Sequence, residues 1–230
     1  IGTVHADSVQ LMKRFAFEAG VSTSVYIIAE EDQKTIFNQS IATILTNEKT
    51  SEMERLSDFL GFKKSPFAQK DWRQEMKTIT EYARANNLDR EALEKSKLYS
   101  IKSYFELYPE VSSNSSEFFR ERLKYLLDNT ISELKEHPDT TKKKDSLISL
   151  LSGILKNLNL RGAIYWFEWQ QIAKACDDAP AKCRETVADL KEFALSHNTH
   201  PDFHNDLKSY LTKIFDLAAE ALDEYENYKK

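Results

Sequence analysis

Glycine and proline are scarce in this sequence, with five of each among 230 residues. An all-β chain or a dinucleotide-binding α/β chain of this length needs more turn-forming residues, so this scarcity favours helices. One short run, Val25–Ile28, has a strand-like pattern. It lies in the segment 22–46, whose apolar residues continue at helical spacing, and we interpret that segment as a helix. The sequence therefore predicts an all-α protein without significant β-sheet.

Catalytic signatures are also missing from the sequence. It contains no G-x-S-x-G nucleophile elbow, no phosphate-binding loop, no dinucleotide fingerprint and no H-E-x-x-H zinc motif. No cofactor is predicted, and no stretch of the chain resembles a known family. These absences lower the expectation that the protein is an enzyme without excluding it.

A broad basic field is lacking, because 32 Lys and Arg residues stand against 37 Asp and Glu residues, for a net charge of −5. Nucleic acid is therefore not an expected partner. The one basic run, Lys142–Lys144, is short and is interpreted as a solvated connection before a helix. The longest apolar stretch is interrupted by charged residues, so no transmembrane segment is predicted.

Cysteine occurs only twice, at Cys176 and Cys183, on either side of a turn that contains Pro180. Two helices that meet at this turn would bring both thiols to one corner, which predicts a disulfide and an oxidising compartment. Two free thiols are the alternative. Near the start of the chain, Thr3–Ala6 has the residue spacing of a signal-peptidase site. Together these features predict a secreted or periplasmic protein.

Apolar residues at helical spacing are abundant, and they predict a bundle of about eight or nine amphipathic helices. Helix-boundary signals include Gly61 as a C-terminal cap, Asp89 as an N-terminal cap and a capping box at Ser51–Glu54. The densest stretch, 147–176, predicts a long central helix. We expect a single helical domain over 1–230, with a possible subdivision into two halves at the serine-rich loop 111–116.

Aromatic residues crowd the second half of that central stretch, at Tyr165, Trp166, Phe167 and Trp169. Large rings at helical spacing usually fill a core. The same rings could line a pocket for an apolar ligand. The two interpretations are compatible, because imperfect packing around several rings leaves a cavity.

Histidines gather before the last helix, at His197, His200 and His204, with Asp202 and Asp206 close by in sequence. Imidazole and carboxylate groups together would suit a transition metal. Pro201 between two of the histidines argues against a shared helical face, and helix-end capping is the simpler explanation. The tripeptide His-Pro-Asp occurs twice, at 137–139 and 200–202, each time between predicted helices.

These observations lead to two functional hypotheses. The first is a non-enzymatic, extracytoplasmic helical protein that acts through protein–protein interaction with an unidentified partner. The second is a carrier of a small apolar or lipid-like ligand in an aromatic-lined cavity of the bundle. The first rests on the missing catalytic motifs and the amphipathic helices, and the second on the aromatic cluster at 165–169.

Overall fold

The computed structural model describes residues 4–18, 30–62 and 71–228. Within these ranges the chain forms ten α-helices, two short 3₁₀ helices and no strand, so the all-α prediction is confirmed. The strand-like run Val25–Ile28 lies outside the described residues. Only the second part of the predicted helix 22–46 is described, as helix α2.

The helices follow one another with short connections. In chain order they are α1 (Val4–Arg14), α2 (Glu30–Ile44), α3 (Asn47–Leu60), α4 (Trp72–Ala85), α5 (Arg90–Phe105), α6 (Ser116–Glu136), α7 (Lys142–Arg161), α8 (Trp166–Asp177), η1 (Ala181–Cys183), α9 (Ala188–Leu195), η2 (Ser196–Thr199) and α10 (Pro201–Tyr228).

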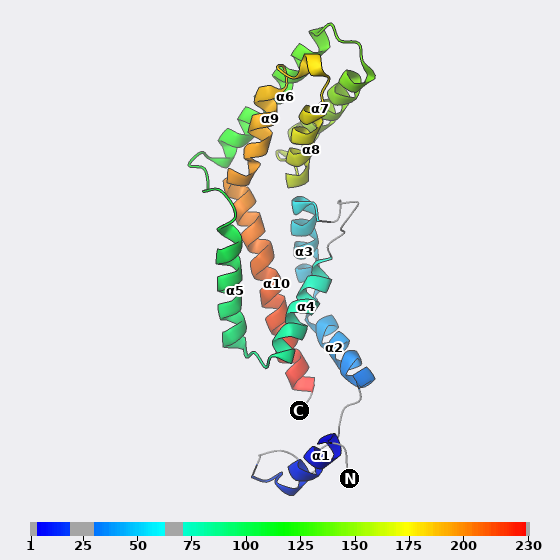
Figure 1. The fold of residues 1–230 in the computed structure, drawn as a ribbon, viewed down its shortest axis with the longest axis vertical. Coiled ribbons are helices and arrows are strands. Elements are labelled where there is room, and N and C mark those ends of the chain that lie inside the picture. Colours follow the sequence, from blue (N-terminus) through cyan, green and yellow to red (C-terminus); the bar gives the residue numbers. More distant parts are fainter. Residues whose placement is uncertain (1–3, 19–29, 63–70, 229–230) are drawn as a thin grey trace.

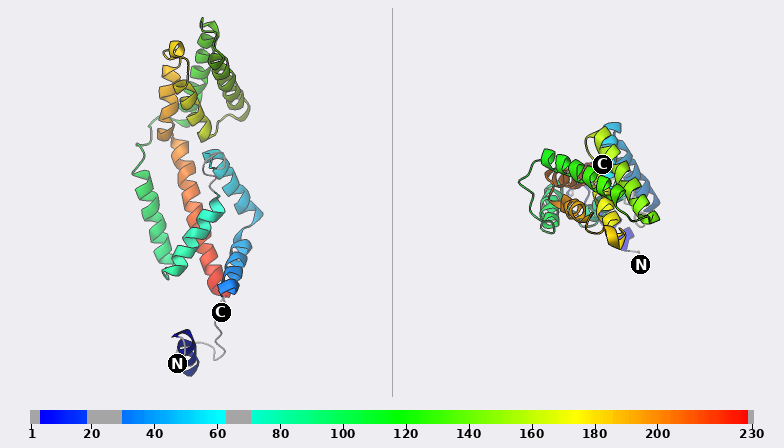
Figure 2. Two further views of the ribbon diagram at one scale, coloured as in Figure 1. Left: turned by 45° about the vertical axis from the view of Figure 1, so that its right-hand side comes forward. Right: turned by 90° about the horizontal axis from the view of Figure 1, so that it is seen from above.

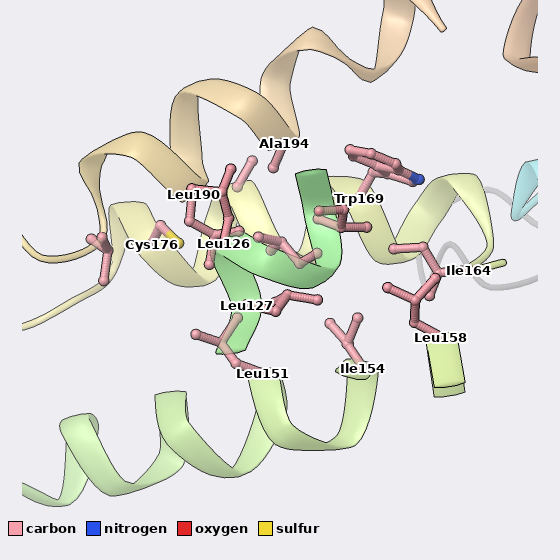
Figure 3. Close-up of a cluster of buried hydrophobic side chains, with 14 of the residues drawn as sticks. Leu126, Leu127, Leu151, Ile154, Leu158, Ile164, Trp169, Cys176, Leu190 and Ala194 are labelled. Atoms are coloured by element: carbon pink, nitrogen blue, oxygen red, sulfur yellow. The ribbon is translucent and has the colours of Figure 1, made fainter. Parts of the chain in front are cut away.

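Helices α2 to α10 form two groups that lie one after the other along the longest axis of the molecule (Figures 1 and 2). Helices α6 to α9 pack on one another at one end, and helices α2 to α5 pack against α10. Among the described residues, buried apolar side chains form three clusters, and Figure 3 shows part of the largest. The loop 111–116 lies in the connection from α5 to α6, where the chain passes between the groups. The single domain with a possible subdivision at this loop remains a prediction.

The predicted central helix 147–176 is wrong in one respect, because the chain breaks it into α7 and α8. Gly162 ends α7 with a left-handed backbone (φ 72°), which glycine adopts without steric cost, and its N–H donates to the carbonyl oxygen of Leu158. Tyr165 then caps α8 through its backbone N–H, which donates to the Glu168 carboxylate (2.7 Å). The longest described helix is instead α10, with 28 residues.

The predicted disulfide is not formed, since Cys176 and Cys183 are both buried free thiols. Cys183 belongs to the 3₁₀ turn after Pro180, and its Sγ lies 3.7 Å from Nδ1 of His137, in the loop after α6. Its side chain is therefore engaged with that loop rather than bonded to Cys176. The argument for an oxidising compartment loses this support, and the secreted or periplasmic location remains a prediction. No helix within the described ranges is long and apolar enough to cross a membrane.

Candidate functional site

A cavity of about 320 Å³ lies where the two groups of helices meet. Helices α3, α6, α7, α8 and α10 contribute to its wall, together with the α7–α8 connection and the end of η2. The apolar part of the lining is formed by Phe59, Leu123, Leu158, Ala163, Ile164, Trp166 and Trp169. The polar part is formed by Arg55, Ser116, Glu117, Arg120, His200, Asp202 and Asp206.

Three helices begin at this cavity, and their capping fixes the residues that line it. The hydroxyl of Ser115 accepts from the N–H of Phe118 (3.2 Å) and starts α6. The capping box at Tyr165 starts α8, and Pro201 is the first residue of α10. The unpaired N–H groups of a helix start carry a partial positive charge. Each first turn here supplies an acid that offsets this charge: Glu117, Glu168 and Asp202.

The aromatic wall of the cavity is closely packed. Trp166, Trp169 and His200 are only 4%, 3% and 5% exposed. The two indole rings stack with centroids 6.4 Å apart, and His200 meets Trp166 edge to face at 5.0 Å. The indole N–H of Trp166 donates to Oδ2 of Asp206 (3.0 Å), which ties α8 to α10 across the junction.

The four predicted ligand-binding residues divide between two places. Trp166 and Trp169 line the cavity. Tyr165 and Phe167 do not, and their rings stack on each other 5.6 Å apart. Phe167 covers the backbone of Gly61 so closely that a Cβ there would lie 2.6 Å from the Cβ of Phe167. These two rings therefore join α3 to α8 outside the cavity.

The three histidines predicted as metal ligands are each engaged in a local hydrogen bond. His197 Nδ1 donates to the carbonyl oxygen of Ala194 (2.9 Å), and His204 Nε2 donates to that of Asn198 (2.7 Å). His200 Nδ1 accepts from the N–H of Asp202 (3.0 Å). No three His, Cys, Asp or Glu side chains in the described parts of the chain are placed to hold a metal ion. In the structure these rings cap helix ends and pack on aromatic neighbours, and the metal site stays a prediction.

Burial sets the protonation of two of these histidines. Loss of water around His200 lowers the pKa of its imidazole to about 4, although the nearby Asp202 carboxylate acts in the opposite direction. Burial also lowers the pKa of His197. His200 is therefore neutral at physiological pH and carries its proton on Nε2, because Nδ1 accepts a hydrogen bond.

The acids of the cavity are not all paired. Arg120 forms ion pairs with Glu117 and Glu121 beside it on α6. Asp202 and Asp206 form no ion pair within the described residues. Burial raises the pKa of Asp206 above its ordinary value, and the hydrogen bond from Trp166 and the charge of Arg55 offset this only in part. Sequence reasoning grouped Asp202 and Asp206 with the histidines, but gave no signal for Arg55.

Three other hollows are larger: two of about 570 and 550 Å³ lie beside α8, and one of about 330 Å³ lies between α6 and α9. The first two have no aromatic side chain in their lining, and the third has one, the half-buried Phe193. The junction cavity is therefore the better candidate for a ligand site, because buried aromatic walls with a few polar groups are typical of such sites.

Comparisons with models of protein families, with curated proteins and with solved structures find no significant match for this chain.

Proposed function

We propose that this protein binds a small, mainly apolar molecule in the cavity between its two groups of helices. The observation that carries the proposal is the wall formed by Trp166 and Trp169, two buried indoles that face an open volume of about 320 Å³. This volume is at the lower end of the range for ligand pockets, which is about 300–1,000 Å³. A compact molecule with one ring therefore fits the proposal better than a long acyl chain.

The proposal keeps the carrier hypothesis from the sequence and narrows it. The polar groups of the cavity lie around an apolar wall, so the cavity would orient a bound molecule as well as hold it. The wall is built from helix starts, whose positions are fixed by capping, so the site is formed before a ligand arrives. The proposal does not depend on the compartment in which the protein works.

Titration with 2-phenylethanol tests this proposal. Two of the three tryptophans line the cavity and the third, Trp72, is buried in the other group of helices, so intrinsic fluorescence reports on the site. We expect saturable binding with a dissociation constant of about 10⁻⁴–10⁻³ M, as befits a ligand of this size. Hexadecanoate, measured in the same way, is expected to show no saturable binding.

A blocking variant provides the control. Ala163→Phe adds a ring to an exposed position of the cavity lining, and should weaken 2-phenylethanol binding at least about tenfold while the fold is kept. Ala85→Phe, at an exposed position at the end of α4, should leave binding unchanged. Unsaturable fluorescence changes, or equal binding by Ala163→Phe and the wild type, would contradict the proposal.

Protein–protein interaction is the second candidate function, and one surface favours it. Helix α5 packs on α10 and leaves an outer stripe of four residues: Lys95, Leu98, Tyr99 and Lys102. Their spacing places them on one face. Leu98 and Tyr99 are 60% and 72% exposed. Lys95 already pairs with Glu91 at 2.6 Å, so Lys102 is the cation that this surface offers to an acid on a partner protein beside the apolar centre.

Recovery of partners with two matched variants tests this second function. A partner that the wild type recovers from its native fluid should be lost with the double variant Leu98→Ser, Tyr99→Ser. The same partner should be retained with Ala163→Phe, which alters only the cavity. Equal recovery by the wild type and the double variant would argue against the α5 stripe.

A further inference from the structure

The charge balance inside the junction cavity points to the kind of ligand that it holds, and this step rests on the proposed ligand-binding function. Asp206 contacts the aromatic wall directly, because its Oδ2 accepts from the indole N–H of Trp166 at 3.0 Å. Asp206 belongs to the cavity lining, and its other carboxylate oxygen accepts no hydrogen bond from the described residues. The carboxylate is thus fixed in position with one acceptor to spare.

No positive group in the described parts of the chain forms an ion pair with this carboxylate. Arg120 is taken by Glu117 and Glu121, and Arg55 acts on Asp206 through its charge without forming an ion pair in the described structure. Asp202 adds a second negative charge nearby. A half-buried carboxylate with so little compensation is costly, and a bound cation would remove that cost.

An anionic ligand is the natural alternative, because three helix starts and two arginines border the cavity. The partial charges of the helix starts are already matched by acids of their own first turns. One of the arginines is likewise already paired. With Asp202 assigned to the start of α10, the charged groups left over in the lining are Asp206, which is half-buried against Trp166, and Arg55, which is exposed on α3. The charge beside the aromatic wall is therefore negative.

We propose that the natural ligand is a small organic cation, an amine joined to an apolar or aromatic body, whose ammonium group pairs with Asp206 while its body lies against Trp166 and Trp169. Charge-assisted hydrogen bonds between ammonium and carboxylate are strong in a partly desolvated site. The same carboxylate selects the amine over a neutral alcohol of the same shape and repels a carboxylate.

Three molecules with one common body test the proposal: 2-phenylethylamine, 2-phenylethanol and 3-phenylpropanoate. Binding to the full chain is measured by calorimetry at pH 7 and low salt. We expect the amine to bind at least tenfold more tightly than the alcohol, and the carboxylate to bind most weakly. Equal affinity for all three would overturn the cation proposal and leave the ligand-binding function standing. Absence of binding by all three would overturn both.

A matched pair of variants on one helix locates the effect. Asp206→Asn removes the charge but keeps an oxygen that accepts from Trp166, and should reduce amine affinity about tenfold without changing alcohol affinity. Asp223→Asn makes the same change farther along α10, where Asp223 pairs with Arg90 outside the cavity lining, and should change neither. An equal loss of amine affinity in both variants would contradict a direct contact.

Arg55→Gln keeps the proposal testable if Asp206→Asn does not fold. Arg55 is exposed on α3, so its replacement is safe for the fold. Removal of its charge should strengthen amine binding two- to threefold and weaken any binding of 3-phenylpropanoate. Weaker amine binding in this variant would contradict the assignment of the ammonium group to Asp206.

Discussion

Two turns of this protein share the sequence His-Pro-Asp and the same backbone, yet they lie in different surroundings. In both, the histidine ends a helical segment with an extended backbone (ψ 133° at His137 and 129° at His200). In both, Nδ1 of the histidine accepts from the N–H of the aspartate, at 3.2 and 3.0 Å. The proline that follows explains the extended backbone, because it disfavours the helical conformation of the preceding residue.

The surroundings of the two rings differ sharply. His137 is half-buried and contacts the thiol of Cys183 at one end of the molecule. His200 is buried at the junction among Phe119, Trp166 and Trp169, in the wall of the candidate cavity. The tripeptide therefore determines a local turn, and the tertiary fold decides whether its imidazole is a surface cap or part of a core.

The largest expected difference between the turns is in stability. His200→Ala should lower the free energy of unfolding by about 3 kcal/mol, because it leaves a cavity between buried rings and removes a hydrogen bond. His137→Ala should cost about 1 kcal/mol, mainly for the lost turn hydrogen bond. Urea unfolding followed by circular dichroism measures both. Equal losses would mean that burial of His200 contributes nothing beyond the turn.

A difference of similar size is expected in the pH dependence of stability. The pKa of His200 is about 4 in the folded protein and about 6.5 when unfolded, so the unfolded chain binds the extra proton between these values. Stability from this group is complete above about pH 6.5 and is lost as the pH falls toward 4. Each unit of pKa difference corresponds to about 1.4 kcal/mol.

His200→Asn isolates this contribution, since asparagine does not titrate and its side-chain oxygen can accept from the N–H of Asp202. Between pH 6.5 and 4 the wild type should lose about 2 kcal/mol more than the variant. His197 and Asp202, the titrating neighbours that act on His200, remain in both proteins. If His137→Asn changed the pH dependence of the free energy of unfolding as much as His200→Asn does, the distinction between the two turns would be removed.

Helix boundaries show how far the sequence determines this fold. Gly61 has the predicted left-handed backbone at the end of α3, and Asp89 caps α5 as expected, because both signals act within a few residues. The prediction that a capping box at Ser51–Glu54 starts a helix is wrong, since α3 begins at Asn47 with Thr46 as its cap. The sequence gives no clear signal of a helix end at Gly162, because apolar residues continue on both sides of it and mask the break in helical spacing.

The candidate cavity was predictable only in part, for a different physical reason. An aromatic cluster is visible in sequence, and two of its residues, Trp166 and Trp169, line the cavity. Their neighbours in sequence, Tyr165 and Phe167, lie outside the cavity because the break at Gly162 sets which side of α8 faces the junction. Asp206 meets Trp166 across 40 residues of chain, and Arg55 arrives from α3. No local pattern encodes such tertiary contacts.

The smallest expected effect is the one in which the two turns should agree. Pro201→Ala and Pro138→Ala should each lower the free energy of unfolding by about 0.5–1 kcal/mol, because proline at a compatible position acts by restricting the unfolded chain. That restriction is independent of burial, so the surroundings of the two turns should not matter. Urea unfolding of the two variants side by side measures it. A loss at Pro201 several times that at Pro138 would show that the turn at the cavity is held by tertiary contacts of the proline ring itself, and the tripeptide would then no longer account for the shared backbone.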